Sequence, residues 1–128
     1  MSKYPIEMKS NLEGALANLL AAKESLEAGH YEIAVSRAGE AAFHTGSLLL
    51  LDDEIEPGTH GNVITLLQEI FVNGRRLTKE QGGNLNWLFA LRNAEDRGTA
   101  APVNYEEAHK AIEIAESFFE AAKVILEA

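Results

Sequence analysis

Three polar residues interrupt an otherwise apolar stretch, and their spacing could place them at one site. Residues 30–51 read HYEIAVSRAGEAAFHTGSLLLL, and Arg37, Glu40 and His44 recur there at intervals of three and four. On an α-helix these intervals put side chains on one face. A guanidinium, a carboxylate and an imidazole on one face could bind an anion, exchange a proton or form an internal ion-pair network.

A second polar cluster ends a later apolar run. Residues 92–97 read RNAEDR, and we expect this cluster to meet the first one in a groove between two helices. A mid-helix arginine among apolar positions needs a carboxylate or a ligand phosphate, because a buried unpaired charge is costly. Two interpretations stay open, an ion-pair network of Arg37, Glu40 and Arg92, or nucleotide binding. A further candidate is His60, at the expected start of a third helix. The candidate groove then comprises Arg37, Glu40, His44, His60, Arg92, Asp96 and Arg97.

A metal site is not predicted. Glu40 and His44 form one pair of ligand types, but a metal site inside a helical bundle needs a second matched pair on another helix, and the sequence has none. The acidic run at 52–56 does not follow the spacing of a calcium-binding loop. We therefore expect no metal ion and no cofactor.

The composition limits the kinds of partner. The chain has 128 residues, and we predict a single domain over residues 1–128. The formal net charge of −9 disfavours general nucleic-acid binding and leaves Arg75 with Arg76, or Arg37 with Arg92, as local RNA contacts. The absence of cysteine excludes disulfides, thiolate catalysis and cysteine-based zinc sites. No signal-peptide pattern and no apolar run of roughly 20 residues is visible, so we expect a cytoplasmic protein that does not bind a membrane.

Apolar periodicity predicts an all-α fold, an up-and-down bundle of four to five helices. Two helices are expected at 5–28 and 30–51. A third begins at the N-cap Thr59 and ends at 73–74, and a fourth runs from Thr78 to Arg92. After a loop at 98–103, a fifth begins at Asn104, with Glu107 completing a capping box.

Two apolar stretches predict how these helices pack. The stripe of the first helix comprises Leu12, Ala15, Leu16, Leu19, Ala22 and Leu26. In the second helix, Gly39 lies among small residues, which lets another helix approach closely and offsets the roughly 1 kcal/mol that glycine costs in a helix. Residues 48–51 are apolar all round, which indicates burial on more than one side or an oligomer contact, and we predict a homodimer.

Three segments in this order resemble the HEPN domain family (higher eukaryotes and prokaryotes nucleotide-binding), in its small prokaryotic single-domain branch. Residues 34–44 read AVSRAGEAAFH, similar to the pattern A-x-S-R-x-Y-Y-A-x-F-H. Residues 60–63 read HGNV, similar to H-K-G-V, and residues 92–97 are similar to R-x-x-A-D-Y. The likeness extends over about residues 10–125.

The resemblance implies a helical bundle that dimerises and often accompanies a minimal nucleotidyltransferase in a toxin–antitoxin-like pair. Many members are metal-independent ribonucleases with an Arg-x(4–6)-His motif, whose histidine acts on the 2′-hydroxyl or the leaving oxygen and whose arginine stabilises the phosphate charge. Arg92 matches the arginine of this motif, but Arg97 stands where the histidine is expected. A guanidinium keeps its proton near neutral pH and cannot be the base. Gly39 and Glu40 replace the two tyrosines of the family pattern.

Three functions stay open. The first is a catalytically degenerate HEPN dimer that binds a nucleotide, an RNA end or a partner protein. The second is an active ribonuclease that uses another base, such as His44 or His60. The third is a structural or regulatory subunit, such as the partner of a nucleotidyltransferase. We favour the first function, which overlaps with the third, because the motif histidine is missing.

Overall fold

Five α-helices make up most of the described structure. The computed structural model describes residues 2–96 and 102–128 and contains no strand in these ranges. The helices are α1 (Pro5–Glu27), α2 (Tyr31–Asp52), α3 (His60–Leu66), α4 (Lys79–Asp96) and α5 (Tyr105–Glu127), and α3 continues directly into the π-helical segment η1 (Leu67–Val72). The prediction of an all-α helical bundle is confirmed. Arg97 and most of the loop expected at 98–103 lie outside the described residues.

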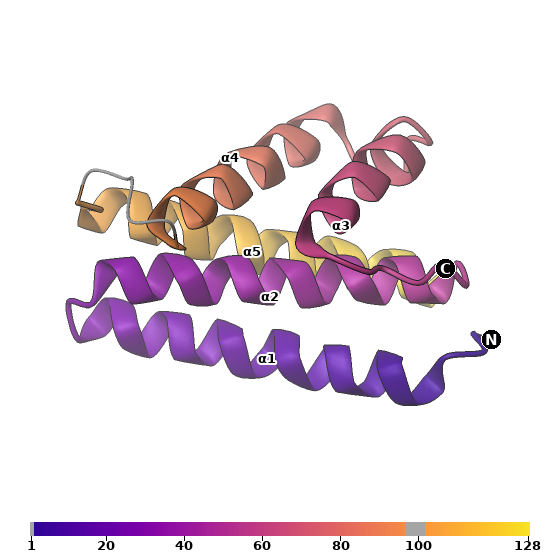
Figure 1. The fold of residues 1–128 in the computed structure, drawn as a ribbon, viewed down its shortest axis with the longest axis horizontal. Helices are drawn as coiled ribbons and strands as arrows, with labels where there is room; N and C mark the ends of the chain where they lie inside the picture. Colours follow the sequence, from indigo (N-terminus) through magenta and orange to yellow (C-terminus); the bar gives the residue numbers. More distant parts are fainter. Residues whose placement is uncertain (1, 97–101) are drawn as a thin grey trace.

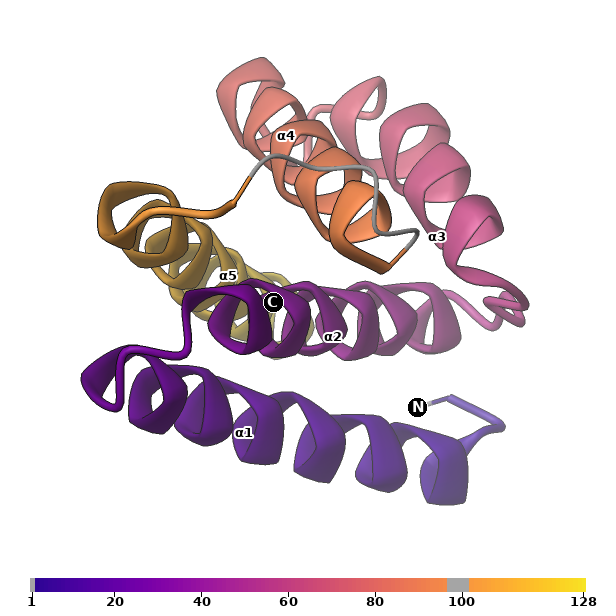
Figure 2. The same ribbon diagram turned by 60° about the vertical axis from the view of Figure 1, so that its left-hand side comes forward.

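The central element is α2, which contacts α1, α3, α4 and α5. Figures 1 and 2 show α1 beside α2 along its whole length, with α3 and α4 crossing on the other side of α2. Small buried side chains allow this close packing, and they comprise Ala34, Ala38, Ala41 and Ala42. Residues 48–51 are also buried, each at most 4% exposed. Burial within one chain therefore accounts for their apolar character, and they no longer support an oligomer contact.

Capping interactions fix where three helices begin. The Thr59 side chain accepts a hydrogen bond from the backbone N–H of Asn62, and Thr78 is joined to Gln81 by two reciprocal hydrogen bonds. At the start of α5, Asn104 and Glu107 form the expected capping box. The helix starts predicted from these residues are confirmed, whereas α4 extends beyond Arg92 to Asp96.

The first helix is covered on one side only. Ala15, Leu19 and Ala22 are buried, but Leu12 and Leu16, which belong to the predicted core stripe, are 41% and 50% exposed. That part of the prediction is wrong because the main contacts of α1 are with α2 and α5, and the buried face that they create is narrower than the apolar stripe. None of the helices, as far as the structure describes them, has the length and hydropathy needed to span a membrane.

Candidate functional site

Glu40 of α2 is the residue on which polar side chains from three helices converge. Its Oε1 accepts a hydrogen bond from the guanidinium of Arg92 on α4 and lies 3.2 Å from Nε2 of His60, the first residue of α3. Its Oε2 lies 4.0 Å from Nε2 of His44, one turn further along α2. We call Glu40, His44, His60 and Arg92 the Glu40 cluster.

The aliphatic chain of Arg92 lies directly over a glycine. A Cβ added to Gly39 would collide with the Cβ, Cγ and Cδ atoms of Arg92. The Arg92 side chain is 10% exposed, so the guanidinium approaches Glu40 from a largely buried position. The close approach predicted at Gly39 is confirmed, and the group that approaches is the arginine of the second polar cluster.

His44 is positioned by two residues of α1. Its Nδ1 lies 2.8 Å from Oδ1 of Asn11, and the amide nitrogen of Asn11 donates to the backbone oxygen of Glu7. Since the amide nitrogen is engaged there, the Asn11 oxygen faces the ring, and Nδ1 of His44 must donate to it. Gly14 makes room for the ring, because a Cβ at that position would lie 2.8 Å from Cδ2 and Nε2 of His44. In the neutral ring, Nε2 is then free to accept a proton.

The environment of His44 favours that neutral form. Burial lowers the pKa of His44 below its usual 6.5, the carboxylate of Glu40 partly opposes this effect, and His60 lowers the pKa further. His44 is therefore neutral at pH 7, with Nδ1 as the donor and Nε2 as the acceptor.

His60 rests on an aromatic ring beside the cluster. The rings of Phe43 and His60 have centroids 3.8 Å apart and an interplanar angle of 32°. The His60 side chain is 39% exposed, so it lies at the surface of the cluster, whereas Arg92 lies at its base. A ligand that reaches the cluster from solvent would meet His60 before Arg92.

The structure brings together four of the seven predicted residues. Arg37 stands apart, because it is exposed and donates to Oδ1 of Asn18 on α1 at 3.3 Å. The predicted ion-pair network is therefore wrong for Arg37, which lies in water and needs no buried carboxylate. Asp96 is the last residue of α4, and its side chain lies outside the described part, as does the whole of Arg97.

Sequence reasoning missed the residues of α1 that support the site. Asn11, Gly14 and Asn18 recur at intervals of three and four in an apolar helix, as Arg37, Glu40 and His44 do in the next one. Antiparallel packing of two such helices places Asn11 beside His44 and Asn18 beside Arg37. The matching spacing was the available signal, but it identifies a contact only once the register of the two helices is known.

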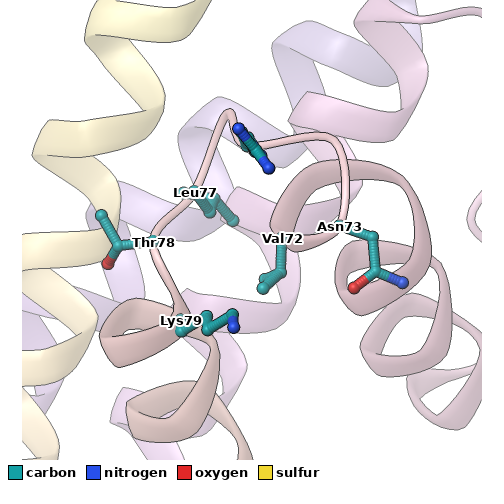
Figure 3. A pocket seen from close by; sticks show the side chains of 6 residues that line it. Val72, Asn73, Leu77, Thr78 and Lys79 are labelled. Atoms are coloured by element: carbon teal, nitrogen blue, oxygen red, sulfur yellow. The ribbon is translucent and has the colours of Figure 1, made fainter.

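A separate basic pocket lies at the turn between η1 and α4 (Figure 3). Its volume is about 410 Å³, and its lining comprises Val72, Asn73, Arg75, Leu77, Thr78 and Lys79. Of the arginine pair considered for RNA contact, Arg76 is engaged by Asp53, with Nη2 2.5 Å from Oδ2, and Arg75 lines the pocket. Within the described ranges, no group of three or more His, Cys, Asp or Glu side chains has an arrangement that could hold a metal ion.

Two comparisons with known proteins extend over the same helices. The family model described as HEPN domain matches residues 8–125. A protein of Methanocaldococcus jannaschii described as "Putative toxin MJ0605" is 35% identical over 120 residues, which cover 94% of this chain and 89% of that protein. Both matches include the complete Glu40 cluster.

Proposed function

The chain belongs to the HEPN domain family, and on this premise we propose that it binds a nucleotide or an RNA through a phosphate at the Glu40 cluster. The observation that carries the proposal is that one guanidinium and two imidazoles, from three helices, gather around a single anion. The guanidinium of Arg92 and the ring nitrogen of His60 can donate to phosphate oxygens, whereas His44 contributes an acceptor nitrogen.

The position of Arg92 supports this proposal physically. In a region of reduced dielectric, a hydrogen bond to a charged group is stronger than at a fully hydrated surface. Arg92 is largely buried and fixed over Gly39, so it offers a prearranged contact for an anion. The overall charge of −9 repels nucleic acid, so recognition would rest on this local site and on few phosphate contacts.

The biological setting that we propose is a toxin–antitoxin-like pair. The similarity to a protein described as a toxin supports it, and the family resemblance suggests that the partner is a minimal nucleotidyltransferase. A nucleotidyltransferase reading frame next to the gene, and co-purification of the two products, would be expected. We propose that the chain acts by binding rather than cleavage, because Arg97 stands where the family motif has its histidine.

One observation favours a second candidate, a metal-independent ribonuclease. The neutral His44, with Nδ1 bonded to Asn11, leaves Nε2 able to take the proton of an RNA 2′-hydroxyl. The 2′-oxygen would then attack the adjacent phosphorus, and the 5′-oxygen would leave with a proton from His60 or water. Incubation of mixed RNA with EDTA tests this candidate, since cleavage that disappears in His44→Ala would establish it.

Binding is tested by fluorescence anisotropy with a short labelled RNA of mixed sequence. We expect Arg92→Lys and His60→Ala each to weaken binding about tenfold, because each removes hydrogen bonds to a charged group. Arg75→Ala removes a cation from the pocket at the start of α4 and serves as the matched control. Failure of the wild-type protein to bind RNA or nucleotide, or an equal loss in Arg75→Ala, would contradict the proposal.

A further inference from the structure

The Glu40 carboxylate contacts Arg92 and His60, the donors that we propose for a ligand phosphate. We infer that Glu40 is an internal competitor for this site, and that the donors it engages favour a terminal phosphate monoester over an internal phosphodiester. The inference rests on the proposed function, since it concerns the same cluster. The expected ligand is a nucleotide or the phosphorylated end of an RNA.

The contacts of Glu40 are those that a phosphate would make. One carboxylate oxygen accepts from Arg92 and lies within 3.2 Å of the His60 nitrogen, while the other faces His44. A phosphate oxygen is an acceptor of the same kind and would compete for Arg92 and His60, the two donors among these contacts. Binding at this cluster thus exchanges one anion for another.

The two partners of the ion pair differ in their freedom to move. Arg92 is 10% exposed and its chain is confined over Gly39, whereas the Glu40 side chain is 28% exposed. Two methylene groups join the carboxylate to α2, so the carboxylate can turn into solvent by side-chain rotation. The helices and the guanidinium can then remain in place while a ligand takes the site.

Charge decides which phosphates can displace Glu40. A phosphate monoester carries a charge of about −1.5 to −2 near pH 7, because its second pKa is about 6. An internal phosphodiester carries a single charge, like the carboxylate that it would have to replace. A diester therefore gains little charge attraction from the exchange with Glu40, whereas a monoester gains from its additional charge.

The test measures the binding of one RNA sequence in two forms, with a 5′-phosphate and with a 5′-hydroxyl. The proteins compared are wild type, Glu40→Gln and Glu113→Gln. Glu113 also pairs with a histidine, at 3.0 Å from His109, but lies exposed on α5, so its replacement removes the same charge away from the cluster. We expect wild type and Glu113→Gln to bind the phosphorylated RNA about tenfold tighter than the hydroxyl form. Glu40→Gln should bind both RNAs more tightly, because the competing carboxylate is gone, and should keep the preference for the phosphorylated form.

The outcomes distinguish a failure of the proposed function from a failure of the inference about Glu40. If wild type binds RNA through Arg92 but Glu40→Gln behaves like Glu113→Gln, the proposed function stands and the inference about Glu40 is overturned. If no variant binds either RNA, both are overturned. Glu40→Asp, which keeps the charge on a shorter chain, provides a second variant should Glu40→Gln not fold, and its affinity for both RNAs should fall between those of wild type and Glu40→Gln. A Glu40→Asp protein that binds like wild type would then count against the inference.

Discussion

At the scale of single residues, His44 shows how neighbours set the chemistry of a side chain. Its ring is held between Asn11 and Gly14 of α1, and its second nitrogen faces Glu40. Burial, together with His60, lowers its pKa, while Glu40 acts in the opposite direction. His44 is therefore a neutral base fixed in one tautomer, whether or not it takes part in a reaction.

We predict that Asn11→Asp raises the pKa of His44. The substitution places a carboxylate where Nδ1 donates at 2.8 Å, and a carboxylate favours the protonated imidazole. NMR titration of the imidazole protons measures the effect directly, with Asn18→Asp as a control on the same helix. An unchanged His44 titration in Asn11→Asp would show that this hydrogen bond does not form in solution.

The same pKa shift predicts how stability depends on pH. An unfolded histidine titrates near 6.5, and folded His44 titrates at a lower pH, so the unfolded state binds the extra proton first. The stability that neutral His44 contributes is therefore present above pH of about 6.5 and is lost as the pH falls through the folded pKa. Urea unfolding of wild type, His44→Gln and the control His109→Gln measures this. A wild-type advantage over His44→Gln that stays constant with pH would contradict it.

At the scale of the helices, the contact of Gly39 with Arg92 joins α2 to α4. Alanine normally favours a helix over glycine, but at this position its methyl group would meet a confined and largely buried side chain. Local helix propensity and packing between helices therefore act in opposite directions. We expect packing to dominate because Arg92 cannot move away without leaving Glu40.

We predict that Gly39→Ala destabilises the protein by about 1–3 kcal/mol, as overpacking of a core typically does. Gly83→Ala is the matched control, because Gly83 also lies inside a helix but has no atom within 4 Å of the added Cβ. The control should gain about 0.5–1 kcal/mol from helix propensity. Thermal or urea unfolding measures the stability of both variants. A gain in stability for Gly39→Ala as well as for Gly83→Ala would show that the Arg92 side chain moves aside at little cost.

The helices were predictable where the signal is local in sequence. Thr59, Thr78 and Asn104 cap helices because their partners lie three residues away. Contacts between helices were harder to predict. Glu40 was correctly associated with Arg92 and His44, but Arg37, on the same predicted face, bonds to Asn18 instead. The residue periodicity of one helix does not determine which neighbouring helix packs against each edge of its face.

At the scale of the whole molecule, α1 carries an exposed line of leucines. Leu12, Leu16 and Leu20 are 41%, 50% and 61% exposed. Leu16 and Leu20 also line a hollow of about 320 Å³ together with Phe119 of α5. If the chain forms the homodimer that the sequence suggests, this face is a better candidate for the contact than residues 48–51, which are buried.

We predict a dimer in solution that Leu16→Glu dissociates with little loss of protomer stability, because the substituted side chain is half exposed. Ile33→Glu is the control, since Ile33 is equally exposed, at 50%, but lies on α2. Light scattering at micromolar concentration gives the mass of each variant. A monomeric wild type would refute the dimer, and a dimeric Leu16→Glu would place its contact elsewhere.

The π-helical segment η1 determines how α3 is rotated about the helix axis relative to the residues at the end of the same helix. Before η1, α3 presents His60 to Glu40, and near the end of η1, Phe71 is fully buried in the core. The wider π-turn holds an extra residue compared with α-helical winding. Deleting one residue from 67–70 would turn His60 by about 100° relative to Phe71, since an α-helix turns by that angle per residue. A single-codon insertion or deletion in this segment would therefore reshape the site during evolution without replacing any side chain in it.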